Sequence, residues 1–83
     1  MPWRVEVSRR ARRELMALPA DVRRAVGLAL ERLASDPSGA DLKKLSDGSW
    51  RLRVGQWRAI LDLDNQTGLI SVQRVLNRRD AYR

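Results

Sequence analysis

Three arginines near the middle of the chain are spaced so that they could hold a phosphate group. Arg51, Arg53 and Arg58 lie on the two sides of the dipeptide Gly55-Gln56, in a stretch that alternates apolar and charged residues. This pattern predicts a β-hairpin, because alternation is typical of half-buried strands and a glycine-led pair is typical of a two-residue turn. The predicted register pairs Val54 with Trp57, Arg53 with Arg58, Leu52 with Ala59, and Arg51 with Ile60. All three guanidinium groups then lie on one face of the sheet, which we call the arginine face.

A ligand explains the arginine face better than folding does. Two arginines directly opposite each other, as predicted for Arg53 and Arg58, destabilise a strand pair by about a few tenths of a kcal/mol. An anionic ligand would remove this repulsion. Guanidinium groups bind phosphate oxygens in pairs and keep their charge near neutral pH, so a polyphosphate is the expected ligand.

The composition limits the chemistry that the chain can perform. Its 83 residues suffice for one domain, expected over residues 1–83. The sequence has no cysteine and no histidine, which excludes thiolate zinc sites, cysteine nucleophiles and the side chain best suited to proton transfer at neutral pH. Any catalysis is therefore expected to need neither a metal nor a cofactor. The 17 lysine and arginine residues outnumber the 10 acidic ones, and the net charge of +7 favours a polyanionic partner.

The hydropathy pattern gives no reason to expect a membrane partner. No apolar run approaches the roughly 18 residues that a spanning helix requires. The absence of cysteine also fits a reducing compartment. We therefore expect a soluble, unprocessed protein of the cytoplasm.

Two helices are expected to form a hairpin over one face of the sheet. Ser8 is a typical N-cap residue for a helix over residues 9–18, and Pro19 ends that helix. The second helix is marked by apolar residues at helical spacing, which are Val22, Ala25, Val26, Ala29, Leu30 and Leu33. A connection this short makes the two helices antiparallel neighbours.

Four strands are expected, over residues 3–7, 50–54, 57–64 and 69–76, with residues 37–49 as a polar link. The expected fold is α+β, with the order β-α-α-β-β-β and an antiparallel sheet that carries the helical hairpin on one face. Trp50 and Trp57 should face the helices.

Pairing Asp64 with Leu69 sets the expected face of each residue in the last strand. It places Ser71, Gln73 and Val75 on the arginine face. Strict alternation then brings Asn77, and not Arg78, to the arginine face. A bulge, or the end of the strand before Arg78, would be needed to bring that arginine into the same site.

Several segments of the chain resemble the RelE/ParE superfamily of bacterial toxin–antitoxin toxins. They are the tetrapeptide Leu42–Leu45, the hairpin Trp50–Arg58, the run Asp62–Asp64 and the ending Val75–Arg83. The likeness covers nearly the whole chain and is closer to the RelE branch, whose members cut mRNA on the ribosome. It implies a metal-independent endoribonuclease in which a 2′-hydroxyl attacks the neighbouring phosphate and leaves a 2′,3′-cyclic phosphate.

The resemblance also assigns residues to roles. The positions that match the catalytic set of the family are Arg51, Arg53, Arg58, Arg78 and Tyr82. The further positions expected to bind RNA are Lys43, Lys44, Arg79 and Arg83. Relatives carry lysine at the positions of Arg51 and Arg53, and some have histidine where this chain has Asn77. Arginine releases its proton too reluctantly for acid–base catalysis, so two alternatives stay open: a ParE-like inhibitor of DNA gyrase, or an RNA-binding toxin relic with weak catalysis.

A toxin of this class implies a cognate antitoxin, and we expect a hetero-oligomer of the two chains. The antitoxin is expected to be an acidic segment that becomes ordered on binding and covers the helices and the arginine face. The ribosome and mRNA are the other partners that the resemblance implies.

Overall fold

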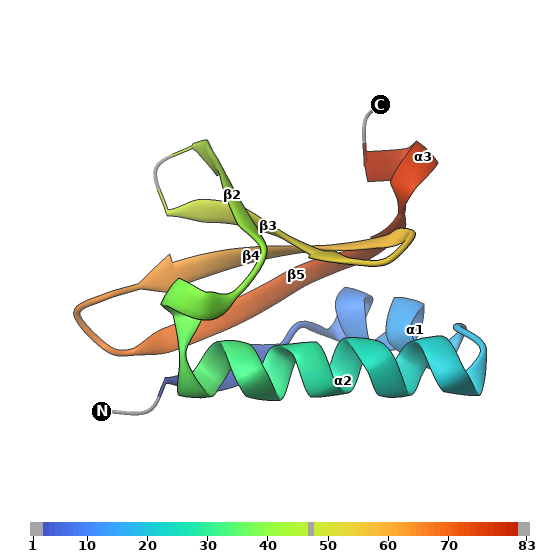
Figure 1. The fold of residues 1–83 in the computed structure, drawn as a ribbon, viewed down its shortest axis with the longest axis horizontal. Coiled ribbons are helices and arrows are strands. Elements are labelled where there is room, and N and C mark those ends of the chain that lie inside the picture. Colours follow the sequence, from blue (N-terminus) through green and yellow to red (C-terminus); the bar gives the residue numbers. More distant parts are fainter. Residues whose placement is uncertain (1–2, 47, 82–83) are drawn as a thin grey trace.

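The computed structural model describes residues 3–46 and 48–81 as two helices packed on one face of a five-stranded sheet, with a short terminal helix (Figure 1). The elements in chain order are β1 (Arg4–Val7), α1 (Arg9–Met16), α2 (Ala20–Ser35), a 3-10 turn η1 (Pro37–Gly39), β2 (Leu42–Ser46), β3 (Ser49–Val54), β4 (Trp57–Asp64), β5 (Leu69–Asn77) and α3 (Arg78–Ala81). This confirms the α+β class and the helical hairpin on one face.

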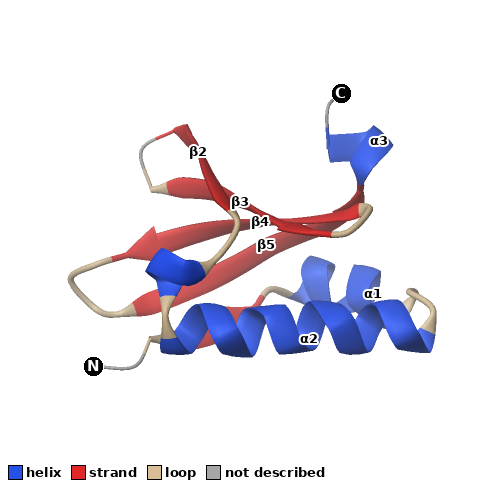
Figure 2. Cartoon of the chain, viewed as in Figure 1, coloured by secondary structure: helices blue, strands red, loops and turns tan. Residues whose placement is uncertain are grey.

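The sheet has the strand order β1-β5-β4-β3-β2 (Figure 2). The pairs β2–β3, β3–β4 and β4–β5 are antiparallel, whereas β1 lies parallel to β5. The sheet is therefore mixed, and the expectation of a wholly antiparallel sheet was wrong for its first strand. Tight turns enforce antiparallel pairing, but β1 is joined to the rest of the sheet through the helical hairpin, which imposes no such constraint.

A fifth strand lies in the segment that was expected to be a polar link. β2 pairs with β3 at the sheet edge, and its register shifts between Lys44 and Ser46. Only Leu42 of this strand packs against the core. Short, lysine-bearing strands are typical of exposed sheet edges, and they lack the apolar alternation by which a strand is identified in a sequence.

Both helices begin where the sequence indicates. The Ser8 side chain accepts a hydrogen bond from the backbone N–H of Ala11, as expected of an N-cap. α1 ends at Met16, two residues before the predicted end, and Pro19 directly precedes α2. No helix in the described part of the chain is long and apolar enough to cross a bilayer.

One core lies between the helices and the sheet. Its buried members are Ala11, Leu18, Val26, Leu30, Leu33, Leu52, Ala59, Leu61, Ile70, Val72 and Val75. Trp50 and Trp57 pack against this core from the sheet, which confirms that they face the helices. The opposite face of the sheet is consequently free to carry charged side chains.

The hairpin of β3 and β4 has the predicted register, including Arg53 opposite Arg58. Gly55 has a φ of +59°, while no other residue type in the described chain has a positive φ. This combination identifies a type II′ turn, which requires glycine at its first central position.

β5 contains a bulge that sequence reasoning left open. Leu61 pairs with Val72, but Ile60 pairs with Arg74, so Gln73 is an extra residue in β5. Val75 is consequently only 3% exposed and belongs to the core, so its predicted place on the arginine face was wrong. The extra residue shifts the pairing of β5 with β4 by one position, so each later side chain of β5 lies on the face opposite to the predicted one.

Candidate functional site

The arginine face is built by strand alternation. Arg51 and Arg53 flank the buried Leu52 in β3, and Arg58 precedes the buried Ala59 in β4. Because successive side chains of a strand point to opposite faces, these arginines lie on the face away from α1 and α2. The structure therefore places three of the predicted site residues together on adjacent strands.

Arg58 is the most deeply buried cation of this face, with 3% of its surface exposed. Its Nη1 donates hydrogen bonds to the carbonyl oxygens of Gly55 (2.8 Å) and Trp57 (2.9 Å). Its Nε is the one buried side-chain nitrogen or oxygen in the described residues that has no hydrogen-bond partner. Arg58 thus binds the β3–β4 turn, and a phosphate oxygen can reach Nε only if the residues around it move.

The other two arginines of the hairpin are more accessible. Arg53 is exposed and Arg51 is partly buried. Lys43 of β2 lies directly opposite Arg51, so it joins the arginine face. Lys44 lies opposite Trp50 and therefore belongs to the other face. The register of β2 separates two lysines that the sequence could not distinguish.

Arg78 approaches the same turn from the end of β5. Its backbone N–H donates to the carbonyl oxygen of Gln56 at 2.7 Å. Its exposed side chain lines a shallow hollow with Gln56, Asn77 and Arg79. The turn is therefore held by the side chain of Arg58 and by the backbone of Arg78. Two further predicted site residues, Tyr82 and Arg83, lie outside the described residues.

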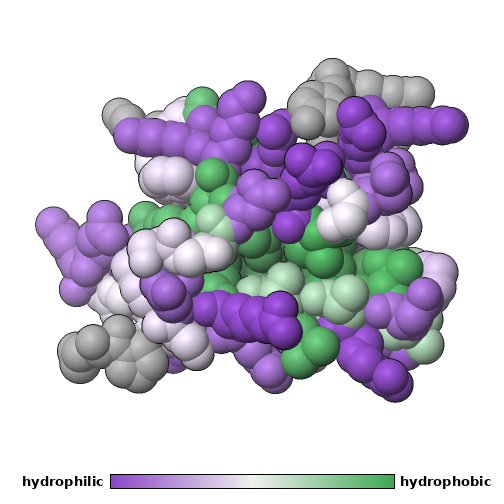
Figure 3. Space-filling view, viewed as in Figure 1, coloured by the Kyte–Doolittle hydropathy of each residue, from purple (hydrophilic) through white to green (hydrophobic). Residues whose placement is uncertain are grey.

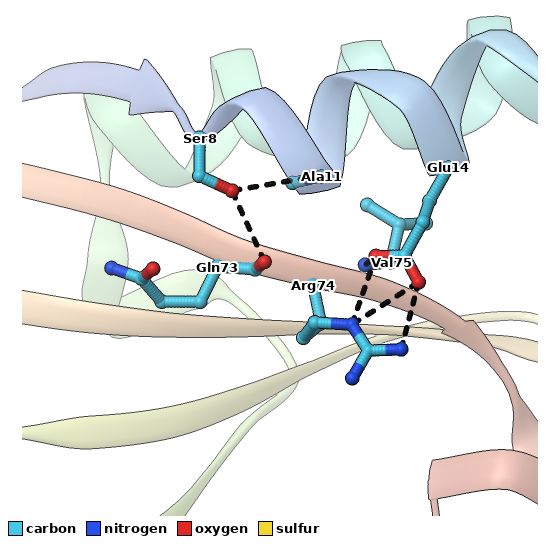
Figure 4. A network of polar contacts seen from close by, with 6 residues as sticks. All are labelled: Ser8, Ala11, Glu14, Gln73, Arg74 and Val75. Atoms are coloured by element: carbon cyan, nitrogen blue, oxygen red, sulfur yellow. Dashed lines mark hydrogen bonds and ion pairs between the residues drawn. The ribbon is translucent and has the colours of Figure 1, made fainter.

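Arg74 is a cation near the arginine face that sequence reasoning did not single out. Its Nε donates to both carboxylate oxygens of Glu14 at 3.1 Å, and its Nη2 lies 2.9 Å from Oε2 of Glu14 (Figure 4). Partial burial tends to raise the pKa of Glu14. The hydrogen bonds from Arg74 and from the N–H of Val75, with the charges of Arg74 and Arg10, outweigh burial and lower this pKa below its ordinary value of 4.5. The charge of Arg74 is thus balanced within the protein.

Along β4, the carboxylate nearest to Arg58 on the arginine face is that of Asp62. Asp62 of β4 is two positions beyond Ile60, and its Oδ2 accepts a hydrogen bond from Nε2 of Gln73 at 3.2 Å. It stands opposite Ser49, about 13 Å along the strand from Arg58 at the usual rise per residue. Asp62 is therefore remote from the turn that Arg58 and Arg78 bind.

The opposite side of β3 is hollowed along α2. Figure 3 shows apolar surface between the polar surfaces of α2 and of β2 and β3. Two hollows lie there, lined by α2 residues Val22, Ala25 and Ala29 and by β3 and β4 residues Leu52, Val54 and Trp57, among others. Arg32 and Arg53 supply positive charge at one of these hollows, and Asp36 and Asp41 supply negative charge. This groove lies on the helix side of the sheet and meets the β3–β4 hairpin at Arg53, Gly55 and Gln56.

The contacts of Arg58 predict that it stabilises the fold as well as the site. Arg58→Ala should lower the free energy of unfolding by about 1–3 kcal/mol, because two turn carbonyls lose their donor and a buried side chain is deleted. The matched control Arg53→Ala should change it by less than about 0.5 kcal/mol, because Arg53 is exposed and its removal relieves the repulsion from Arg58. Urea unfolding of both variants measures the difference. Equal effects would contradict a bracing role for Arg58.

Comparison with known proteins places this chain in a family. The profile described as the ParE toxin of the type II toxin–antitoxin system parDE matches residues 5–82. No curated protein sequence matches the chain.

Solved structures share the fold over almost the whole chain. The RelBE2 toxin–antitoxin complex from Mycobacterium tuberculosis is 28% identical with a TM-score of 0.82, covering 94% of this chain and 100% of that chain. The RelE–RelB complex from the archaeon Pyrococcus horikoshii is 24% identical with a TM-score of 0.82, covering 94% and 97%. A variant of Escherichia coli RelE in the free state is 19% identical with a TM-score of 0.78, covering 99% and 90%. Since the family profile extends over residues 5–82, the chain belongs to the ParE toxin family of type II toxin–antitoxin systems, within the RelE/ParE superfamily.

Proposed function

We propose that this toxin cleaves mRNA on the ribosome by a metal-independent reaction at the arginine face. The observation that carries the proposal is the placement of Arg51, Arg53 and Lys43 on one face of adjacent strands, beside the turn that Arg58 and Arg78 hold. Like charges in this arrangement repel one another, and a bound phosphodiester would remove that repulsion. A ribosomal target would require a cytoplasmic location.

The cations suit the charge that develops in the reaction. The 2′-oxygen of RNA forms a bond to phosphorus while the bond from phosphorus to the 5′-oxygen breaks, and negative charge accumulates on the phosphate oxygens between these events. Preorganised guanidinium groups lower the energy of that state. We assign this role to Arg51 and Arg53, whose side chains are accessible, and to Arg78 at the end of β5. Arg58 supports the turn and holds positive charge beneath the site.

Proton transfer is the demanding part of this proposal. A base must accept the proton of the 2′-hydroxyl, and an acid must protonate the departing 5′-oxygen. Arginine is a poor choice for either role. Lys43 on the arginine face and Tyr82, which lies outside the described residues, are the side chains that we propose for these transfers.

A second candidate function is inhibition of DNA gyrase, in which the chain acts as a binding protein. Two observations favour it. The matching family profile is that of ParE toxins. The chain also has arginine at positions 51 and 53, where related nucleases carry lysine, and its Arg58 is engaged by its own turn.

Replacing the accessible arginines should separate these functions. In cells that express the toxin, we expect mRNA cuts at codon-phased positions. The double variant Arg51→Ala/Arg53→Ala should lower the cleavage rate about 100-fold or more, as loss of transition-state donors does. The double variant Arg9→Ala/Arg12→Ala removes equal charge from exposed positions of α1 and should cleave at a rate near that of the unmodified toxin.

The measurement is mapping of transcript 5′ ends, paired with a supercoiling assay on purified gyrase. Intact transcripts together with inhibited supercoiling would contradict the nuclease proposal and support gyrase inhibition. Intact transcripts without gyrase inhibition would contradict both and favour an RNA-binding relic.

The register of β2 predicts that Lys43, rather than Lys44, contacts the RNA backbone. Each phosphate contact on single-stranded RNA contributes about −0.7 to the slope of log affinity against log salt concentration. Lys43→Gln should therefore flatten this slope by about 0.7, whereas Lys44→Gln should leave it unchanged, because Lys44 lies on the other face. Fluorescence anisotropy with a short single-stranded RNA at several salt concentrations gives both slopes. Equal slopes for the two variants would exclude Lys43 from the binding face.

We further propose that a cognate antitoxin binds the apolar groove between α2 and β3. Related structures are toxin–antitoxin complexes, as the RelBE2 and RelE–RelB structures show for their own chains. Ala25→Asp places a charge in the groove at an exposed position and should weaken binding of the cognate antitoxin by about 10-fold or more. Ala17→Asp, between the helices, is the matched control. Isothermal titration calorimetry would contradict this placement if both variants bound with unchanged affinity.

A further inference from the structure

The edge of β5 that faces away from β4 changes its partner halfway along the strand. In the part of the chain that the structure describes, β1 pairs with β5 at residues Leu69–Val72. Beyond them, α1 lies beside the edge (Figure 4). The backbone N–H of Ser8 donates a hydrogen bond to the carbonyl oxygen of Val72 at 2.9 Å. The Ser8 hydroxyl donates a second one to the carbonyl oxygen of Gln73 at 3.1 Å. A single residue thus binds two consecutive carbonyls.

The direction of these two carbonyl groups is a consequence of the bulge in β5. In a regular strand, neighbouring carbonyl groups point to opposite edges, so one residue cannot bind both. Here Val72 and Gln73 both direct their carbonyls to α1, and Gln73 is the residue without a counterpart in β4. The Ser8 hydroxyl has a second role, because it also accepts a hydrogen bond from the N–H of Ala11 and so caps the helix. The start of α1 is therefore coupled to the bulge.

Glu14, which lies further along α1, contacts the same edge of β5. Its Oε1 accepts a hydrogen bond from the N–H of Val75 at 3.0 Å, and its carboxylate also accepts hydrogen bonds from the side chain of Arg74. The Glu14 side chain is 22% exposed and that of Arg74 is 31% exposed, so the pair is partly shielded from solvent. Ser8 and Glu14 together bind three backbone groups along this edge of β5, the carbonyls of Val72 and Gln73 and the N–H of Val75.

The bulged half of β5 leads directly to the candidate site. After the bulge, Val75 enters the core, Leu76 lies opposite Arg58, and the N–H of Arg78 reaches the carbonyl oxygen of Gln56. Any loosening of this half would move the start of α3 relative to the β3–β4 turn.

We propose that Ser8 and Glu14 are positioning residues that clamp the bulged half of β5 to α1 and thereby fix Arg78 beside the β3–β4 turn. The effect on catalysis rests on the proposed nuclease function. The structural effect does not, so it can be measured even in a chain that cuts no RNA.

Amide hydrogen exchange of the full chain, followed residue by residue by NMR, tests this clamp. Arg78 N–H is the reporter, because its acceptor Gln56 is untouched by the substitution. Leu63 N–H, bonded to the Gly48 carbonyl elsewhere in the sheet, is the reference. In Glu14→Ala we expect exchange of the Arg78 amide to accelerate about 10-fold or more relative to that of Leu63. Glu31→Ala, at an exposed position of α2, is the control and should change neither amide.

Substitutions of Ser8 separate the clamp from the helix cap. Ser8→Asp keeps a good capping acceptor but cannot donate to the Gln73 carbonyl, so it should accelerate Arg78 exchange as Glu14→Ala does. Ser8→Thr keeps both functions and should behave as the unmodified chain. Equal acceleration at Arg78 and Leu63, or none at either in both Glu14→Ala and Ser8→Asp, would overturn the proposal, because a merely structural role lowers protection throughout the sheet.

The same variants connect the clamp to cleavage. If the unmodified toxin cuts mRNA, Glu14→Ala should lower kcat about 10-fold with little change in KM, because RNA still binds to the arginines of β3. Unchanged kcat in a variant with accelerated Arg78 exchange would show that Arg78 needs no positioning, and it would overturn the catalytic half of the proposal. Absence of cleavage by the unmodified toxin would instead refute the proposed function.

Discussion

The β3–β4 turn is the constraint on which the arginine face depends. Arg58 donates to the carbonyl oxygens of Gly55 and Trp57 at this turn, and the backbone N–H of Arg78 donates to the carbonyl oxygen of Gln56. A guanidinium group that is 3% exposed has lost most of its hydration, and hydrogen bonds to carbonyl oxygens compensate for that loss only in part. The turn and the buried charge therefore support each other, and the arginines of β3 lie on the hairpin that this turn closes.

The two faces of the sheet have different roles: one packs against the helices and stabilises the fold, and the other carries the cations that we propose to bind RNA. Apolar residues of β3, β4 and β5 pack under the helices, while cations of β2 and β3 gather on the other face. Repulsion among those cations opposes folding, so the core and the helix contacts must compensate for it. The pair formed by Glu14 and Arg74 shows the alternative solution, in which a cation is neutralised within the chain. Its contact with Glu14 marks Arg74 as part of the scaffold, whereas we propose that Arg53, at an exposed position of β3, contacts a ligand.

Local sequence patterns predicted the elements whose formation depends on interactions between residues close together in the chain. Alternation and the demand for glycine at the turn determined the β3–β4 register, and the spacing of apolar residues determined both helices. β2 escaped prediction because a short polar edge strand has little apolar alternation, and the parallel pairing of β1 depends on the whole chain path. The bulge at Gln73 could have been suspected from the change of apolar phase between Val72 and Val75, but its partners on α1 are about 60 residues distant. The pairing of Glu14 with Arg74 left no signal in the sequence for the same reason.

Binding of RNA to the accessible arginines of β3 is the central claim, and NMR of arginine side chains tests it most directly. The Nε–Hε signals of Arg51 and Arg53 should shift on titration with a short single-stranded RNA, while those of Arg9 and Arg12 on α1 stay nearly unchanged. Shifts confined to the arginines of α1, with Arg51 and Arg53 unaffected, would contradict the account.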